Sequence, residues 1–213
     1  GAVVLAGSGR AVCSGGDVED IIGARFERDA DGLREFTNMT CDLIASIRSC
    51  RRPVIAALNG TVAGAGAVIA SACDIRIAAD SAKIAFLFVR VGLSGADMGA
   101  SWLLPRLVGL GRATELLMTG DFIDAARAHE IGLYQRVVPA AQLLAEATAL
   151  AERLARGPSP ALAVTKRALD VEAGMEFADA LRYEAEVQAK LMEHPNFREA
   201  YEAFRARRDA KFA

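Results

Sequence analysis

Residues 54–58 form an uninterrupted apolar run, which is typical of a buried strand. A turn at Asn59-Gly60 follows, and Gly64-Ala65-Gly66 then leads into a helix of small residues that ends near Ala72. A second strand is expected at residues 74–78. Because strands that alternate with helices build a mostly parallel sheet covered by helices, this segment predicts the α/β fold class.

Helical periodicity extends on both sides of this segment. Apolar residues recur at intervals of three and four over residues 31–50, which predicts a helix whose buried face carries Leu33, Phe36, Met39, Leu43, Ile44 and Ile47. Four more helices are expected at residues 143–156, 160–172, 177–193 and 197–208. We therefore predict a sheet-bearing core over residues 1–138 and a helical region over residues 139–213, of a kind that often packs on a neighbouring subunit.

Composition and charge exclude several classes of protein. Of the 213 residues 53% are hydrophobic and 24% are charged, as in a globular protein. The net charge of −2 argues against nucleic acid as the main partner. No apolar run approaches the ~20 residues of a membrane-spanning helix, and the first residues lack a signal-peptide pattern, so we expect no membrane partner and a cytoplasmic location.

Cysteine and histidine patterns give no sign of a metal centre. The four cysteines lie far apart without a CxxC pair, so we expect small buried side chains and neither a zinc site nor a disulfide framework at Cys13, Cys41, Cys50 and Cys73. The two histidines, His129 and His194, lie in helical surroundings and are expected at the surface.

Two glycine-rich segments share one design, in which glycines precede the expected start of a helix. They are Gly15-Gly16 and Gly64-Ala65-Gly66. The first turn of a helix leaves N–H groups without partners and carries a partial positive charge, so two such loops that converge would form an oxyanion hole. The alternative is that these glycines serve only to allow tight packing.

Two other glycine motifs are weaker. A dinucleotide-binding turn would need a third glycine or alanine where Ile69 stands, and the next strand ends too soon, at Asp80. The segment Gly92-Leu93-Ser94-Gly95-Ala96 resembles a nucleophile elbow, but its last position is alanine and no histidine partner is in view, so Ser94 is discounted as a nucleophile.

Taken together, the glycine-rich segments and their flanks resemble the crotonase superfamily, the enoyl-CoA hydratase/isomerase family, over nearly the whole chain. The resemblance rests on residues 3–17, on residues 53–66 running into Cys73-Asp74-Ile75-Arg76, and on the later landmarks 90–93 and 117–121. It implies a crotonase-like ββα spiral core with a helical C-terminal region, assembly into trimers or dimers of trimers, and an acyl-CoA substrate with no separate cofactor.

The resemblance also assigns roles to individual residues. The N–H groups of Gly16 and Ala65 would stabilise the enolate of a CoA thioester, and residues Gly15, Asp17, Val18, Gly64, Val68 and Phe88 would line the substrate. Phe204 and the basic residues after it would cap the adenine end of CoA. The run Arg205, Arg207, Arg208 and Lys211 is either a solvated helix face or a site for phosphates.

One departure from the family pattern limits the reaction. Hydratases of this family use two glutamates, and the matching positions here are Val68 and Phe88. Asp97 is a candidate single acid/base that moves a proton between carbons; the alternative is that it caps a helix beginning at Met98. We expect double-bond isomerisation or another enolate step in preference to hydration, or else a catalytically inactive acyl-CoA-binding homologue that acts through assembly or sensing.

Overall fold

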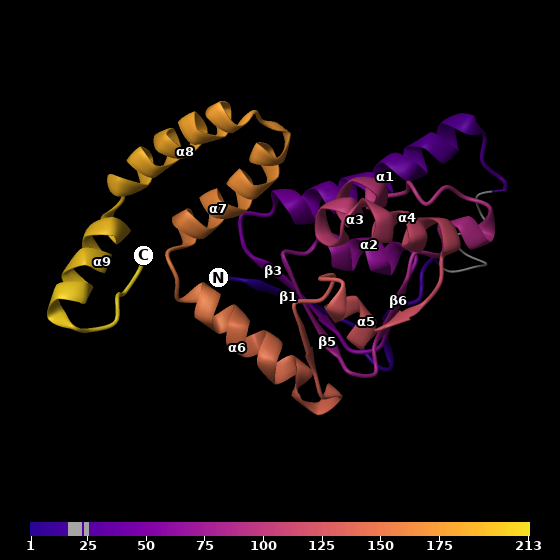
Figure 1. Cartoon of the computed structure of the whole chain (residues 1–213), viewed down its shortest axis with the longest axis horizontal. Helices are drawn as coiled ribbons and strands as arrows, with labels where there is room; N and C mark the ends of the chain where they lie inside the picture. Colours follow the sequence, from indigo (N-terminus) through magenta and orange to yellow (C-terminus); the bar gives the residue numbers. More distant parts are fainter. Residues whose placement is uncertain (17–22, 24–25) are drawn as a thin grey trace. The chain divides into compact units, whose positions relative to one another are not determined.

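The computed structural model describes residues 1–16, 23 and 26–213 (Figure 1). Asp17 and Val18, which the resemblance places against the substrate, lie outside the described residues. The chain divides into two compact units. The sheet unit contains residues 4–48 and 54–147, and the helical unit contains residues 1–3, 49–53 and 148–213. The boundary expected after residue 138 stays a prediction.

The strands form two four-stranded sheets, with orders β1-β3-β5-β8 and β2-β4-β6-β7. The pairs β3–β5, β5–β8, β2–β4 and β4–β6 are parallel, and β7 runs antiparallel to β6. The strands are β1 (Val3–Ala6), β2 (Ala11–Cys13), β3 (Val54–Leu58), β4 (Thr61–Ala63), β5 (Ile75–Ala79), β6 (Lys83–Ala85), β7 (Ile123–Asp124) and β8 (Arg136–Val138).

Each of the first three turns of the spiral adds one strand to each sheet and then a helix. The first turn is β1, β2 and α1 (Ala30–Ser49), and the second is β3, β4 and α2 (Ala65–Ala72). The third is β5, β6, the 3₁₀ helix η3 (Leu87–Val91) and α3 (Ala100–Val108). The predicted α/β class and ββα spiral are confirmed, with two sheets where the alternation of strands and helices alone suggested one.

The core of the sheet unit is made of small and branched residues. All of β3 is buried, and six of the eight residues of α2 are buried as well. α2 packs against α3, and α3 packs against α4 (Leu110–Thr119), as Figure 1 shows. α5 (Ala125–Glu130) then leads to β8.

The predicted helix at residues 31–50 is confirmed as α1, but only part of its predicted buried face is covered. Ile44 is the only residue of α1 that is buried in the described part of the chain, whereas Leu33, Met39 and Leu43 are exposed. Phe36 and Ile47 are half-buried. Periodicity marks a face that is able to pack, and a single copy of the chain covers that face only in part.

The cysteines are also less buried than predicted. Cys73 is buried, but Cys41 is exposed on α1 and Cys13 and Cys50 are half-buried. All four are free thiols. The expectation of buried side chains is therefore correct for Cys73 and wrong for Cys41.

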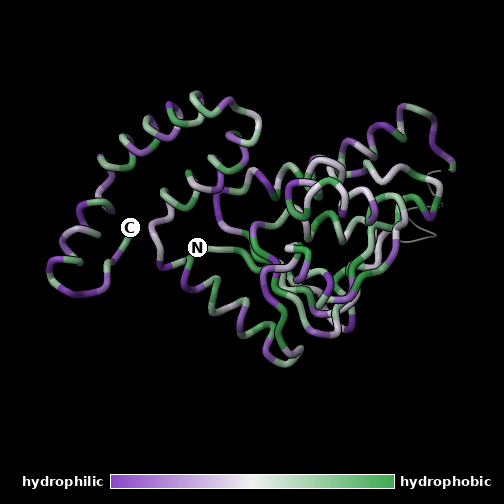
Figure 2. The backbone as a smooth tube through the Cα atoms, in the orientation of Figure 1, coloured by the Kyte–Doolittle hydropathy of each residue, from purple (hydrophilic) through white to green (hydrophobic). Residues whose placement is uncertain are grey.

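The helical unit matches the predicted helices to within two residues. It contains most of α6 (Leu143–Ala155) and all of α7 (Ser159–Val171), α8 (Phe177–Met192) and α9 (Pro195–Ala206). The 3₁₀ helix η5 (Glu172–Gly174) lies between α7 and α8. A second 3₁₀ turn, η4 (Ala140–Gln142), precedes α6 and belongs to the sheet unit. Figure 2 shows hydrophilic and hydrophobic residues alternating along α7, α8 and α9. In the described part of the chain, no helix is both long and apolar enough to span a bilayer.

Candidate active site

The two glycine-rich segments follow strands β2 and β4 and therefore begin at the same end of the sheet β2-β4-β6-β7. Strands β2 and β4 are parallel neighbours, with Ala11 opposite Thr61. A methyl group placed on Gly64 would lie 3.5 Å from the Cα of Gly15, and one placed on Gly15 would lie 3.9 Å from the carbonyl oxygen of Ala63. The loops after β2 and β4 are therefore in near contact through their backbones, as the sequence predicts for converging loops.

The first turn of α2 presents backbone N–H groups at this end of the sheet. The Gly64 N–H donates to the carbonyl oxygen of Ala85 at 3.0 Å. Among residues 1–16, 23 and 26–213, nothing accepts a hydrogen bond from the N–H of Ala65 or Gly66. Ala65 is half-buried and is the first residue of the helix, so its N–H carries part of the positive end of the helix dipole.

Glycine is required at the start of α2 by backbone conformation. Gly64 precedes the helix with φ 54° and ψ −122°, a combination that residues with a side chain rarely adopt. This conformation lets β4 turn directly into α2. Gly16 is exposed and is the last residue described before residue 17. The oxyanion roles of Gly16 and Ala65 stay predictions.

The two positions that match the family's glutamates are apolar and buried. Val68, in α2, is 0% exposed, and Phe88, in η3, is 8% exposed. Neither side chain has a proton to transfer. They supply hydrophobic surface where a hydratase of this family would have an acid and a base.

Asp97 lies in a strained turn just before α3. Its side chain is half-buried, and its carboxylate has no hydrogen-bond or ion-pair partner within the described ranges. Met98 and Gly99 follow with φ 50° and 85°, and Met98 is a buried non-glycine residue in the left-handed region. Such strain is concentrated at functional sites in proteins.

The capping role considered for Asp97 is wrong. α3 begins at Ala100, its N-cap is Gly99, and no side chain caps it. Asp97 instead contributes its backbone carbonyl oxygen, which accepts the Ala100 N–H at 2.8 Å. Because Met98 and Gly99 are left-handed, α3 begins two residues later than residue 98, and the Asp97 carboxylate does not cap it.

The two later family landmarks contact each other. Arg90, at the end of η3, forms an ion pair with Asp121, which follows α4, and its Nε donates to the carbonyl oxygen of Thr119 at 3.4 Å. Asp121 therefore has a structural partner, and Glu115 is exposed on α4.

A buried cation was missed by the analysis of sequence patterns. Arg76 is 2% exposed within β5, where the alternation Ile75-Arg76-Ile77 is the one signal of its position. Burial lowers the pKa of Arg76 to about 10, so the guanidinium is charged at neutral pH. Its contacts are with the C-terminal end of α2.

The histidines have local structural roles. His129 is exposed, and its Nδ1 lies 2.8 Å from the carbonyl oxygen of Tyr134. His194 caps α9, with Nδ1 accepting the Asn196 N–H at 3.2 Å. No group of three or more His, Cys, Asp and Glu side chains in the described ranges is arranged to hold a metal ion.

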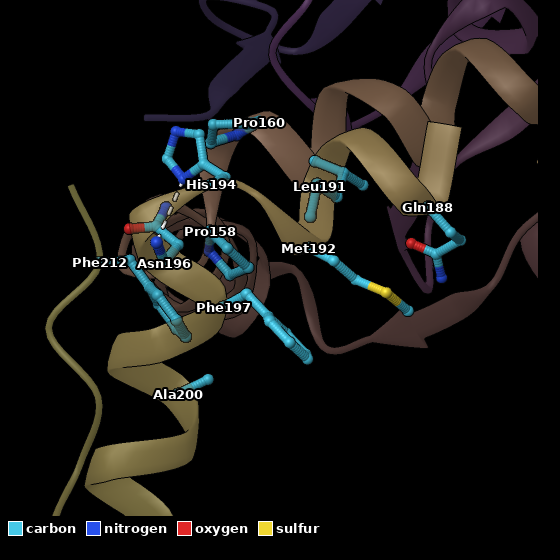
Figure 3. A pocket seen from close by; sticks show the side chains of 11 residues that line it. Pro158, Pro160, Gln188, Leu191, Met192, His194, Asn196, Phe197, Ala200 and Phe212 are labelled. Atoms are coloured by element: carbon cyan, nitrogen blue, oxygen red, sulfur yellow. Dashed lines mark hydrogen bonds between the residues drawn. The ribbon is translucent and has the colours of Figure 1, made fainter. Parts of the chain in front are cut away.

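The helical unit contains an apolar pocket of about 270 Å³. Figure 3 shows Pro158, Met192, Phe197 and Phe212 around it, with His194 and Asn196 joined by their hydrogen bond. None of the residues that the sequence assigned to the substrate lines this pocket.

Phe204 and the basic residues after it lie on α9 and the segment that follows. Phe204 is 85% exposed. Arg208 is held by Glu199 through two hydrogen bonds of 2.6 and 3.0 Å, so one of the four cations proposed for phosphates already has an anionic partner. The Arg208 guanidinium and the backbone N–H of Lys211 lower the pKa of the Glu199 carboxyl to about 2.

Comparison with known proteins decides the family. The model of the family described as enoyl-CoA hydratase/isomerase matches residues 1–213. The chain belongs to the enoyl-CoA hydratase/isomerase family. It is therefore related to enzymes of this family, as the resemblance of its glycine-rich segments implied.

Individual relatives of this family member carry two kinds of name. A probable enoyl-CoA hydratase of Rhodobacter capsulatus is 41% identical over 99% of this chain and 80% of its own length. The 1,2-epoxyphenylacetyl-CoA isomerase of Escherichia coli is 34% identical over 99% of this chain and 80% of its own length.

A solved structure agrees closely with the fold. A putative enoyl-CoA hydratase from Streptomyces coelicolor is 49% identical and superposes with a TM-score of 0.98, covering 100% of this chain and 77% of that one. This likeness confirms the crotonase fold.

Proposed function

We propose that this chain binds an acyl-CoA thioester and stabilises its enolate with the backbone N–H groups of Gly16 and Ala65. The observation that carries the proposal is the near contact of the two glycine-rich loops, with the Ala65 N–H left without a partner in the described part of the chain. A half-buried N–H group without a partner is costly unless water or a ligand accepts from it. The names of the Rhodobacter and Escherichia relatives both refer to CoA thioesters, which supports this substrate class.

The reaction is double-bond isomerisation or another enolate step. Asp97 removes a proton from a carbon of the enoyl-CoA, and the electron pair moves onto the thioester oxygen in the oxyanion hole. The protonated Asp97 then returns the proton to a different carbon, and the double bond shifts. The apolar, buried side chains of Val68 and Phe88 support this reaction over hydration by two glutamates.

The remaining predicted site residues complete the substrate site in this proposal. Gly15 lines the adenine end of CoA, Gly64 brings the backbone close to the thioester, and Val68 and Phe88 bound the acyl group. Phe204 caps the adenine end of CoA from its exposed position on α9.

A panel of 2-enoyl, 3-enoyl and dienoyl-CoA thioesters tests the reaction class. The expected result is a product of unchanged mass with a displaced double bond, detected by mass spectrometry and ultraviolet absorbance. Addition of water at a high rate would contradict the proposal. If several members bound and none changed, the chain would be the inactive acyl-CoA-binding homologue.

Substitution Asp97→Asn tests the proposed acid/base. We expect kcat to fall by roughly 10²–10⁴-fold, because the amide cannot exchange a proton with carbon. The Kd for the substrate changes by less than about twofold, since the carboxylate acts mainly in the transition state. Asp42→Asn is the control, because Asp42 is an exposed carboxylate on α1. Full activity in Asp97→Asn would exclude Asp97 as the base.

Self-association into a trimer or a dimer of trimers is part of the proposal. Large apolar side chains are exposed on α7, α8 and α9, which supports a surface covered by other copies. They include Leu169, Phe177, Met192, Phe197, Tyr201 and Phe204. Sedimentation equilibrium tests this association, and a monomer at all concentrations would contradict it.

A further inference from the structure

The end of α2 opposite the Ala65 N–H is held by two guanidinium groups. Arg76 donates through Nη1 to the carbonyl oxygen of Cys73 at 2.6 Å and to those of Ala70 and Ser71 at 3.4 Å. Arg48, at the end of α1, donates through Nη1 to the carbonyl oxygen of Ala72 at 3.3 Å.

Most of these carbonyl groups have no backbone partner within the helix, although that of Ala70 also accepts the Cys73 N–H at 3.3 Å. The last four carbonyl groups of any α-helix lack intrahelical partners and carry the negative end of its dipole. Here guanidinium N–H groups serve the last three residues of α2 and its C-cap residue, Cys73. A cation is favoured at this end of a helix, and a buried one is favoured more strongly than an exposed one.

Arg76 is itself fixed from the opposite side. Its Nε donates to the carbonyl oxygen of Leu133 at 2.7 Å. Its backbone N–H donates to Oε1 of Gln135 at 2.8 Å, and its carbonyl oxygen accepts the Gln135 N–H at 3.0 Å. The buried guanidinium therefore links α2 to β5 and to the segment before β8, and α2 cannot shift along its axis without breaking these bonds.

We propose that Arg76 is a positioning residue for the oxyanion hole, which it serves by fixing α2 from its C-terminal end so that the Ala65 N–H stays aimed at the thioester oxygen. Arg48 adds a second, weaker anchor at the same end. α2 has eight residues and is therefore about 12 Å long, so a shift at one end is carried to the other. Arg48 also forms an ion pair with the Asp74 carboxylate, with Nη1 and Oδ1 3.8 Å apart. The inference rests on the proposed oxyanion role of Ala65.

Acetoacetyl-CoA is a suitable probe, because its enolate form has its own ultraviolet absorbance and no turnover is needed. The wild-type protein is expected to shift the bound ligand toward the enolate. In Arg76→Met the enolate fraction falls, corresponding to roughly 10- to 100-fold weaker enolate stabilisation, because a displacement of about 1 Å is enough for such a loss. The Kd for free CoA changes by less than about twofold, since CoA does not place an oxygen in the hole.

Three variants separate positioning from simple loss of stability. Arg76→Lys keeps the positive charge but lacks the several N–H donors of the planar guanidinium. It is therefore expected to recover only part of the enolate fraction. Arg48→Met is the milder change, and it is expected to lower the enolate fraction less than Arg76→Met. Arg136→Met is the matched control, because Arg136 is an exposed arginine on β8 that pairs with Glu146 at 3.5 Å; it should behave as the wild type.

The outcomes are distinguishable when measured below the melting temperature of each variant. A folded Arg76→Met protein with the wild-type enolate fraction overturns the inference. If Arg76→Met does not fold, an Arg48→Met protein with the wild-type enolate fraction overturns it instead. A wild-type protein that binds acetoacetyl-CoA without shifting it toward the enolate refutes the oxyanion hole itself.

Discussion

Gly66 is the residue at which α2 comes closest to β2. A methyl group at this position would lie 2.6 Å from Cβ and 2.9 Å from the carbonyl oxygen of Cys13. Such distances are far below van der Waals contact, and backbone atoms cannot move aside as a flexible side chain can. The close approach of the two glycine-rich loops therefore depends on the absence of a side chain at residue 66.

Substitution Gly66→Ala is expected to separate the two loops. The free energy of unfolding should fall by about 1–3 kcal/mol from overpacking. Turnover should fall by roughly 10- to 100-fold as the N–H groups move out of line. Thermal or denaturant unfolding and steady-state kinetics measure the two effects.

The matched control is Gly111→Ala in α4, where an added methyl group meets nothing within 4 Å. It should leave turnover unchanged and raise the free energy of unfolding by up to about 1 kcal/mol, because alanine favours the helix. A Gly66→Ala protein that equals the wild type in both measurements would show that the loops do not depend on this contact.

At the residue scale, the sequence indicated which side chains could take part in chemistry better than it indicated where those side chains lie in the fold. Asp97 was the acid that the sequence singled out, but the alternative role considered for it, capping a helix at Met98, is wrong because Met98 and Gly99 adopt left-handed conformations before α3 begins. Arg76 escaped notice because a single arginine in a strand is usually exposed, and only the fold places it against the end of α2.

At the scale of elements, α9 and the segment after it are joined through Glu199. Its carboxylate accepts two hydrogen bonds from Arg208 and one from the Lys211 N–H. The carboxyl pKa falls from 4.5 to about 2, chiefly because of the Arg208 hydrogen bonds. A carboxyl group with a lowered pKa in the folded state adds stability above its unfolded pKa and loses that contribution as the pH falls toward the folded value.

Protection of the Lys211 amide from hydrogen exchange should therefore be constant above about pH 5 and decline between about pH 4.5 and pH 2. Glu199→Gln should lower this protection at neutral pH and remove its dependence on pH in that range. Glu184→Gln, an exposed substitution on α8, serves as the control. Amide exchange followed by NMR measures the effect, and equal protection in wild type and Glu199→Gln would contradict the assignment.

Helix boundaries were predictable, whereas the partners of helices and strands were not. Gly157-Pro158 and His194-Pro195 interrupt the periodic pattern, and α7 and α9 begin next to them. The predicted face of α1 was correct only in part, because periodicity does not say which surface covers it. The division of strands between two sheets depends on pairing between distant residues, which local patterns do not record.

At the scale of the whole molecule, the family assignment came from several short segments acting together. Each glycine-rich loop alone was compatible with tight packing, but their order and spacing along the chain matched one fold. The ββα spiral then explains why the loops after β2 and β4 meet, since successive turns place these strands side by side and parallel.

Two N–H donors aimed at one thioester oxygen would weaken its C=O bond, and infrared difference spectroscopy detects this directly. The ligand is a saturated acyl-CoA with ¹³C in the thioester carbonyl, matched in chain to whichever thioester the protein converts. We predict a carbonyl band at lower frequency in the complex than in water, and a smaller displacement in Gly66→Ala. A bound carbonyl that absorbs at its solution frequency or above would contradict the oxyanion hole of Gly16 and Ala65.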